Sequence, residues 1–180
     1  MHMMRVDLRV AARESVRNQP TGARDMAIRF HPLNQDFVDQ VRKGGPDANG
    51  MAAEHSVSTG PGNPCRSCLK DIPEGDEMLV LAARPFPRPQ PYAETGPIFL
   101  CAHHCAPYSS IEIPPILQSS PDYLLKGYGI DDRIVYGTGK IVAAEDIETY
   151  ATKVLMDANV AYVDVRSARN NCFQTRITKA

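Results

Sequence analysis

The chain of 180 residues has no tryptophan, few aromatic residues (7%) and a formal net charge of only −1. The near-zero charge argues against a protein built mainly to bind nucleic acid or anionic membrane surfaces. No apolar run is longer than the six residues from Met78 to Ala83, far short of the roughly 20 that a transmembrane helix needs. We therefore expect an ordinary globular chain with no membrane partner.

Proline is missing from the last part of the chain, because all 15 prolines lie between Pro20 and Pro121. Proline fixes φ and removes a backbone donor, so a proline-rich region holds few long regular elements. We predict a single α+β domain over residues 26–180, with a loop- and proline-rich cysteine half over 26–121 and a regular strand-helix-hairpin half over 122–180.

The first 25 residues carry five arginines but no apolar stretch typical of a secretory signal. Met26 then opens an alternating apolar and polar run. We expect residues 1–25 to be a disordered extension, or to precede the natural start. Five cysteines without a secretory signal favour a reducing compartment, so we expect a cytoplasmic location.

Hydrophobic periodicity predicts the elements of the first half. A helix is expected over 33–43 with Asn34 as its cap, and residues 44–63 read as a long loop. Strands are expected over 27–30, 77–84 and 97–101. The last two should pair as a hairpin across an extended, proline-rich link.

The second half has clearer periodicity. The expected elements are a helical turn over 123–125, a strand over 133–143, a helix over 145–157, and strands over 160–165 and 172–178. A turn at Asn170–Asn171 would join the last two strands. The fold class is therefore α+β with small antiparallel sheets.

Four of the five cysteines lie close together in the sequence. Cys65 and Cys68 form a C-x2-C knuckle, and Cys101 and Cys105 follow at the end of the second hairpin strand, where a helix could begin. This order is similar to that of a zinc-ribbon or treble-clef site. We predict that these four thiolates bind zinc and leave no open position, so the site would be structural.

Alternatives to this ligand set remain. His103 or His104 could replace Cys101 as a ligand, or one of them could act in catalysis. The cysteines could also be free, partly buried thiols. A redox pair fits less well, because a turn over 71–75 follows the knuckle where a helix would be needed.

A second set of polar residues is suited to a small anion. Arg166 and Arg169 stand beside two asparagines, and guanidinium and amide groups bind carboxylate or phosphate. The candidate ligand-binding residues are Arg84, Tyr92, Glu94, Arg166, Arg169, Asn170, Asn171 and Cys172. The simpler interpretation is a hairpin turn whose arginines pair with acids such as Glu94 or Asp164. The basic last twenty residues lack exposed aromatics, so nucleic acid is disfavoured as a partner.

Four strings of the sequence resemble, in the same order, a bacterial domain-of-unknown-function family, number 1203. The strings are 64–69, 91–100, 133–139 and 165–173. The resemblance covers about residues 27–179, implies one continuous domain and implies no activity. We therefore expect a cytoplasmic binding or accessory module with structural zinc. The alternative is an enzyme that uses the polar set on a small acidic substrate.

Overall fold

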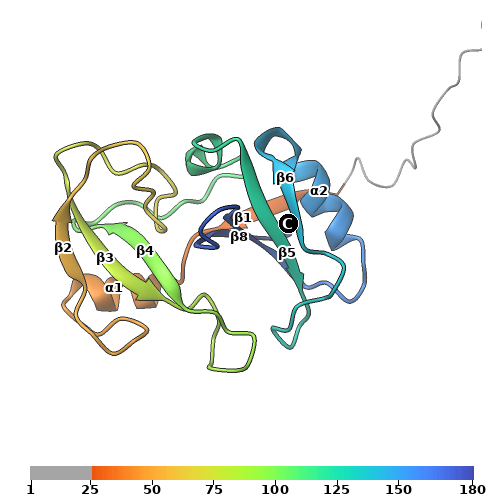
Figure 1. Ribbon diagram of the computed structural model, residues 1–180, viewed down its shortest axis with the longest axis horizontal. Helices are drawn as coiled ribbons and strands as arrows, with labels where there is room; N and C mark the ends of the chain where they lie inside the picture. Colours follow the sequence, from red (N-terminus) through yellow and green to blue (C-terminus); the bar gives the residue numbers. More distant parts are fainter. Residues whose placement is uncertain (1–25) are drawn as a thin grey trace, which may run out of the picture.

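The computed structural model describes residues 26–180, and the expected extension over 1–25 lies outside the described residues. The strands form two antiparallel sheets that lie side by side, and each sheet is accompanied by one helix (Figure 1). The expected mixed α+β class is confirmed at this level.

The five-stranded sheet joins the two ends of the described chain. Its strands are β1 (Ile28–His31), β5 (Asp122–Tyr128), β6 (Lys140–Ala143), β7 (Tyr162–Ser167) and β8 (Phe173–Lys179). They are ordered β1-β8-β7-β5-β6, and every neighbouring pair is antiparallel. The first strand thus pairs with the last, with Ile28 opposite Lys179 and His31 opposite Arg176.

One face of this sheet packs against helix α2 (Ile147–Leu155), which follows a short 3-10 turn, η3 (Ala144–Asp146). The predicted helix is confirmed, because its apolar residues recur at helical spacing and point to one side. Its buried residues are Ile147, Ala151, Val154 and Leu155. They share a core with Leu125 of β5, Val163 and Val165 of β7, and Ile177 of β8.

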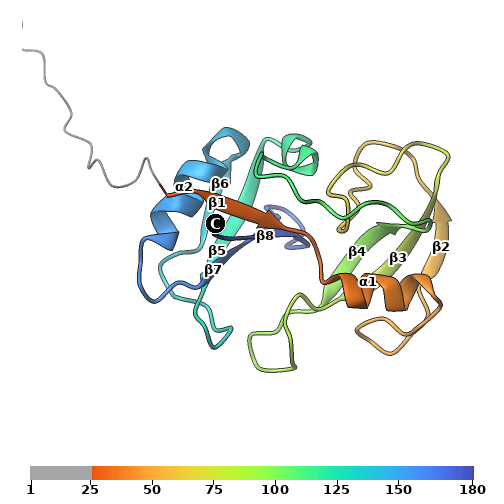
Figure 2. The ribbon, with the colours of Figure 1, turned by 180° about the vertical axis from the view of Figure 1, so that it is seen from behind.

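The three-stranded sheet contains β2 (Glu54–Val57), β3 (Glu77–Ala83) and β4 (Gly96–Cys101), in that order. The predicted β3–β4 hairpin is confirmed, with Met78 opposite Cys101 and Ala83 opposite Gly96. Helix α1 (Gln35–Arg42) follows β1 and packs on this sheet through Val38 and Val41 (Figure 2).

Helix α1 begins where the sequence predicts. The Asn34 side chain accepts a hydrogen bond from the Phe37 backbone N–H at 3.0 Å, and so caps the helix. Because β1 belongs to one sheet and α1 packs on the other, the short connection at residues 32–34 crosses between them.

Three expected elements are corrected. Strand β2 lies inside the predicted loop over 44–63; all four of its side chains are exposed, so no apolar alternation marks it. The predicted helical turn at 123–125 is part of β5, which pairs with β6 and β7 and has alternating burial. The strand predicted over 133–143 shrinks to β6, because the backbone turns at Gly137, whose φ is +90°.

The turn between β7 and β8 is as predicted, with Asn171 in the left-handed region at φ +57°. The division of the chain at residue 121 remains a prediction. Among residues 26–180 no helix is both long enough and apolar enough to cross a membrane.

Candidate metal centre

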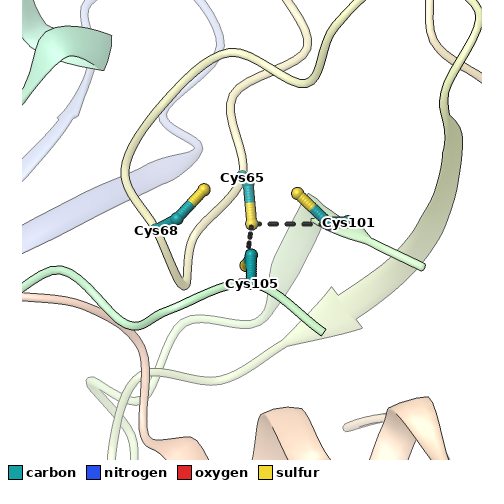
Figure 3. A group of neighbouring side chains, drawn as sticks. All are labelled: Cys65, Cys68, Cys101 and Cys105. Carbon is teal, nitrogen blue, oxygen red and sulfur yellow. Dashed lines mark hydrogen bonds between the residues drawn. The ribbon is translucent and has the colours of Figure 1, made fainter. Parts of the chain in front are cut away.

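The four cysteines come from two loops and one strand end. Cys65 and Cys68 lie on a tight turn, Cys101 ends β4, and Cys105 lies on the irregular segment that follows (Figure 3). Residues 106–114 contain no helix, so the helix expected after this pair is not there. The turn lies beside β4, because Cys65 forms a parallel bridge with Phe99.

The four sulfur atoms all lie within 4.8 Å of one another. In a tetrahedral zinc site with bonds of about 2.3 Å, two sulfurs stand about 3.8 Å apart. The Sγ atoms of Cys65 and Cys105 are separated by 3.8 Å, well beyond a disulfide bond, and all five cysteines are free. The donor set therefore fits a single metal ion such as zinc.

Local backbone bonds form the turn that brings Cys65 and Cys68 together. Cys65 N–H donates to the Lys70 carbonyl at 2.9 Å, and Leu69 N–H donates to the Cys65 carbonyl at 3.0 Å. Leu69 has a φ of +53°, which a branched side chain adopts rarely. The Leu69 side chain is fully buried in the core beneath the five-stranded sheet, so packing offsets this unfavourable backbone conformation.

Hydrogen-bond donors point at two of the sulfurs. The backbone N–H groups of Ser67 and Cys101 each donate to Cys65 Sγ at 3.4 Å. Arg42, in the last turn of α1, donates through Nη2 to Cys105 Sγ at 3.0 Å and through Nε to the Cys101 carbonyl at 3.1 Å. Such donors stabilise thiolates rather than neutral thiols, which accept hydrogen bonds weakly.

The thiols strongly affect one another's ionisation. Contact with the Cys101 thiol lowers the pKa of Cys65 to about 6 and also lowers the pKa of Cys105. The pKa of Cys101 is raised, first by Cys105 and then by Cys65. Four thiolates at this separation repel one another, so all four can ionise together only when a cation offsets their charge.

The two histidines proposed as substitute ligands lie outside the sulfur cluster. His103 and His104 are both exposed, and the metal-ligating group found among residues 26–180 contains cysteines alone. His103 Nε2 lies 3.8 Å from a carboxylate oxygen of Glu77 instead.

Residues 62–179 match the family described as "Protein of unknown function (DUF1203)". The chain belongs to the DUF1203 family. The resemblance seen in the four sequence strings is thus confirmed, over a match that contains all four clustered cysteines. No curated protein and no solved structure shows significant similarity to the chain.

The second predicted site is divided by the fold of this DUF1203 chain. Five of its eight residues line one small cavity of about 150 Å³: Glu94, Arg166, Asn170, Asn171 and Cys172. The other three lie elsewhere. Arg169 is exposed and pairs with Asp122 at 2.7 Å, Tyr92 contacts the exposed Tyr136, and Arg84 lines a different cavity.

Glu94 is the centre of the charges at this small cavity. Lys126 donates to both of its carboxylate oxygens at 2.9 Å, Asn171 donates to Oε1 at 3.2 Å, and Arg166 Nη2 lies 3.0 Å from Oε2. Burial opposes ionisation of Glu94, but Lys126 and Arg166 outweigh it and hold its pKa below the usual value. Glu94 is therefore a carboxylate at neutral pH.

Arg166 is not fully satisfied by these contacts. The residue is only 3% exposed, and its Nε and Nη2 atoms are buried with no aligned hydrogen-bond partner, so the Glu94 contact is an ion pair only. A buried donor without an acceptor is uncommon and is typical of functional sites or of a missing ligand. The simpler interpretation, that Arg166 pairs with Glu94 and Asp164, accounts for its charge but not for all its donors.

Sequence reasoning missed three contributing residues. Arg42 donates a hydrogen bond to Cys105, which follows it by 63 residues in the sequence, and no local pattern reveals a contact at that separation. Lys126 was overlooked because its strand was predicted as a helical turn. Arg66, inside the knuckle, is 2% exposed and donates a hydrogen bond to the Phe173 carbonyl of β8. Only the relative placement of the two sheets brings these residues together.

Proposed function

We propose that this DUF1203 chain is a binding or accessory module whose three-stranded sheet is held by structural zinc on Cys65, Cys68, Cys101 and Cys105. One observation carries the proposal: four thiols from separate parts of the chain lie within 4.8 Å, with one pair at the tetrahedral spacing. A full set of four protein ligands leaves no open position for substrate, which supports a structural role rather than a catalytic one.

The local fold supports a ribbon-like site more than a treble-clef one. The knuckle faces the end of the β3–β4 hairpin, and no helix follows Cys105 within residues 106–114. A treble clef would supply its second ligand pair from the start of a helix. The zinc would therefore join a turn to a hairpin end.

Metal analysis of protein purified without chelator tests this proposal. The wild type should contain about one zinc per chain, with Cys65→Ser well below half of that. Cys172→Ser is the matched control, since Cys172 is the one cysteine outside the cluster, and it should keep the metal. Cobalt substitution should give the visible absorption of tetrahedral thiolate ligation. A wild type holding only a few tenths of a metal ion per chain rejects the proposal.

A second candidate function is binding or conversion of a small acidic molecule at the Arg166 cavity. Arg166 and Asn171 favour it, because both line the cavity and guanidinium and amide groups bind carboxylate or phosphate. Cys172 lines the same cavity and offers a thiol to a bound substrate.

Thermal-shift titrations with sodium phosphate and sodium acetate test this second candidate. A ligand that binds the folded state raises the Tm with concentration. Asn171→Gly, which suits the positive φ and removes the amide, should weaken the shift; Arg169→Ala, outside the cavity, should not. Absence of any anion-dependent shift in the wild type would falsify this candidate and leave the zinc proposal unaffected.

A further inference from the structure

A second cavity is larger than the Arg166 cavity and contains none of the clustered cysteines. It has a volume of about 820 Å³ and is bounded by the start of α1, by the segment after β3 and by residues of β1 and β8. Pro85 and Phe173 also line the small Arg166 cavity, so the two cavities are neighbours.

Most charged groups around this large cavity are satisfied within the protein. Arg176 donates to both oxygens of Asp164, at 2.7 and 3.1 Å, and to the Pro85 carbonyl at 2.7 Å. Asp132 accepts a hydrogen bond from the Tyr162 hydroxyl at 2.7 Å.

Asp47, a further acid at the cavity, is held in the same way. Its two oxygens accept three backbone N–H groups, from Asn49, Met51 and Ala82, at 2.8 to 3.0 Å. Burial opposes ionisation of Asp47, but these three bonds outweigh it and lower its pKa, so Asp47 is an anion whose two oxygens both accept hydrogen bonds. His31 also lines the cavity; burial and then the charges of Arg29 and Arg176 lower its pKa, so its imidazole is neutral at pH 7.

Arg84 is the exception among these groups. Its side chain forms no hydrogen bond or ion pair with any residue of the described part of the chain, and its Nε is buried without a partner. Among the charged residues of the lining, Arg84 is therefore the one whose side chain has no polar partner in the described part of the chain, and its fork of donors matches a carboxylate in geometry. The acids Asp47 and Asp132 line the same cavity, so the lining as a whole has no excess of positive charge.

Polar and apolar surface contribute about equally to the wall of the cavity. Phe37 of α1, Phe86 and Phe173 contribute aromatic rings from three separate segments, and Leu33 and four prolines add to them. Small-molecule sites commonly combine such walls with one or two fixed polar groups that orient the ligand.

We propose that this cavity binds a small organic acid with an apolar body. The carboxylate would pair with Arg84, and the body would contact Phe37, Phe86 and Phe173. The volume accommodates an acid the size of a phenylalkanoate. None of the lining residues is a proposed zinc ligand, and Arg166 does not line this cavity.

The test compares 4-phenylbutyrate with its uncharged amide, which has nearly the same shape. Calorimetry and amide chemical shifts of uniformly labelled protein should give wild-type binding of the acid about tenfold tighter than of the amide. Arg84→Gln should abolish this preference, whereas Arg88→Gln, an exposed arginine near it in the chain, should keep it. No detectable binding of the acid to the wild type, or an unchanged preference in Arg84→Gln, overturns the proposal.

A second variant keeps the test decisive if Arg84→Gln fails to fold. Phe37→Ala, on the half-exposed face of α1, should weaken the acid and the amide to a similar extent, because it removes contact with the apolar body alone. Unaltered affinity of both ligands in Phe37→Ala places binding outside this cavity and likewise overturns the proposal.

Discussion

The five-stranded and three-stranded sheets differ in how they are held together. In the first, β7 is buried along nearly its whole length and lies between β5 and β8, with α2 against one face. In the second, β2 is an exposed edge strand, and much of the region consists of irregular segments between the strands. The comparison suggests that the three-stranded sheet needs a cross-link that the five-stranded sheet does not.

Polar interactions also differ between the two. The five-stranded sheet places charged residues on the face away from α2, where strand register sets Asp164 opposite both Lys126 and Arg176. Around the three-stranded sheet the corresponding polar element is the cysteine cluster with Arg42. Each sheet thus has its own polar centre, and substitutions can remove each centre separately.

The largest expected effect is loss of the cysteine centre. Chelation, or Cys65→Ser, should lower the local stability of the three-stranded sheet by on the order of 5 kcal/mol, below the about 10–16 kcal/mol of zinc-finger peptides because an apolar core remains. Hydrogen exchange should show loss of protection in β3 and β4, with β5 and β7 still protected. Equal loss of protection in both sheets would remove the distinction between them.

The next effect concerns the charged face of the five-stranded sheet. Asp164 is fully buried, and Asp164→Ala leaves the Arg176 guanidinium without its ion-pair partner. We therefore expect the free energy of unfolding, measured by urea denaturation, to fall by about 3–5 kcal/mol. Asp122→Ala, which breaks the exposed pair with Arg169, is the control and should cost at most about 1 kcal/mol. Similar losses of unfolding free energy in the two variants would show that the buried ion pair stabilises the protein no more than the exposed one. Both variants should contain as much zinc as the wild type.

Leu69 tests the boundary between the two regions. It belongs to the cysteine turn but is buried in the core of the five-stranded sheet, so Leu69→Ala should cost about 2–5 kcal/mol by leaving a cavity. Calorimetric unfolding should show both sheets destabilised together. Glycine adopts a positive φ without strain. Leu69→Gly should therefore lower the free energy of unfolding by less than the loss of the side chain alone would. Destabilisation confined to one sheet would contradict this linking role.

The smallest effect is the pH dependence from Glu94. Because its folded pKa is lowered, Glu94 stabilises the protein above its ordinary pKa of about 4.3, and this contribution is lost as pH falls through the folded pKa. The free energy of unfolding should therefore fall between neutral pH and a pH below 4 by a smaller amount in Glu94→Gln than in the wild type. We expect the two decreases to differ by about 1 kcal/mol or less. An identical pH dependence in both proteins would contradict the assigned ion pairs.

Local patterns predicted the elements whose apolar residues face a single core. Helix α2 and the β7–β8 hairpin follow from periodicity and from a turn at Asn171. Strand β2 left no such trace, because its stability comes from backbone pairing with β3 rather than from burial. Strand β5 was misassigned because three adjacent apolar side chains at 123–125 resemble a helical turn, although their exposure alternates in the structure.

The cysteine cluster could be predicted because metal ligands have a restricted spacing in sequence. Its supporting donor Arg42 could not, since that contact depends on how α1 packs against the hairpin. The polar set was predicted as one site, yet Arg84 and Arg166 line different cavities. Arg84 directly follows β3 and Arg166 belongs to β7, so the relative placement of the two sheets decides which cavity each residue lines.

Because β1 pairs with β8, the five-stranded sheet cannot be completed until β8 has been synthesised. All four clustered cysteines and all three strands of the smaller sheet have been translated by Cys105, so this region can close while the ribosome is still at work. Strand β1 must wait for the C-terminal strand. Until β8 has been synthesised, the edge of β1 lacks this partner and can pair with strands of other chains, which favours aggregation.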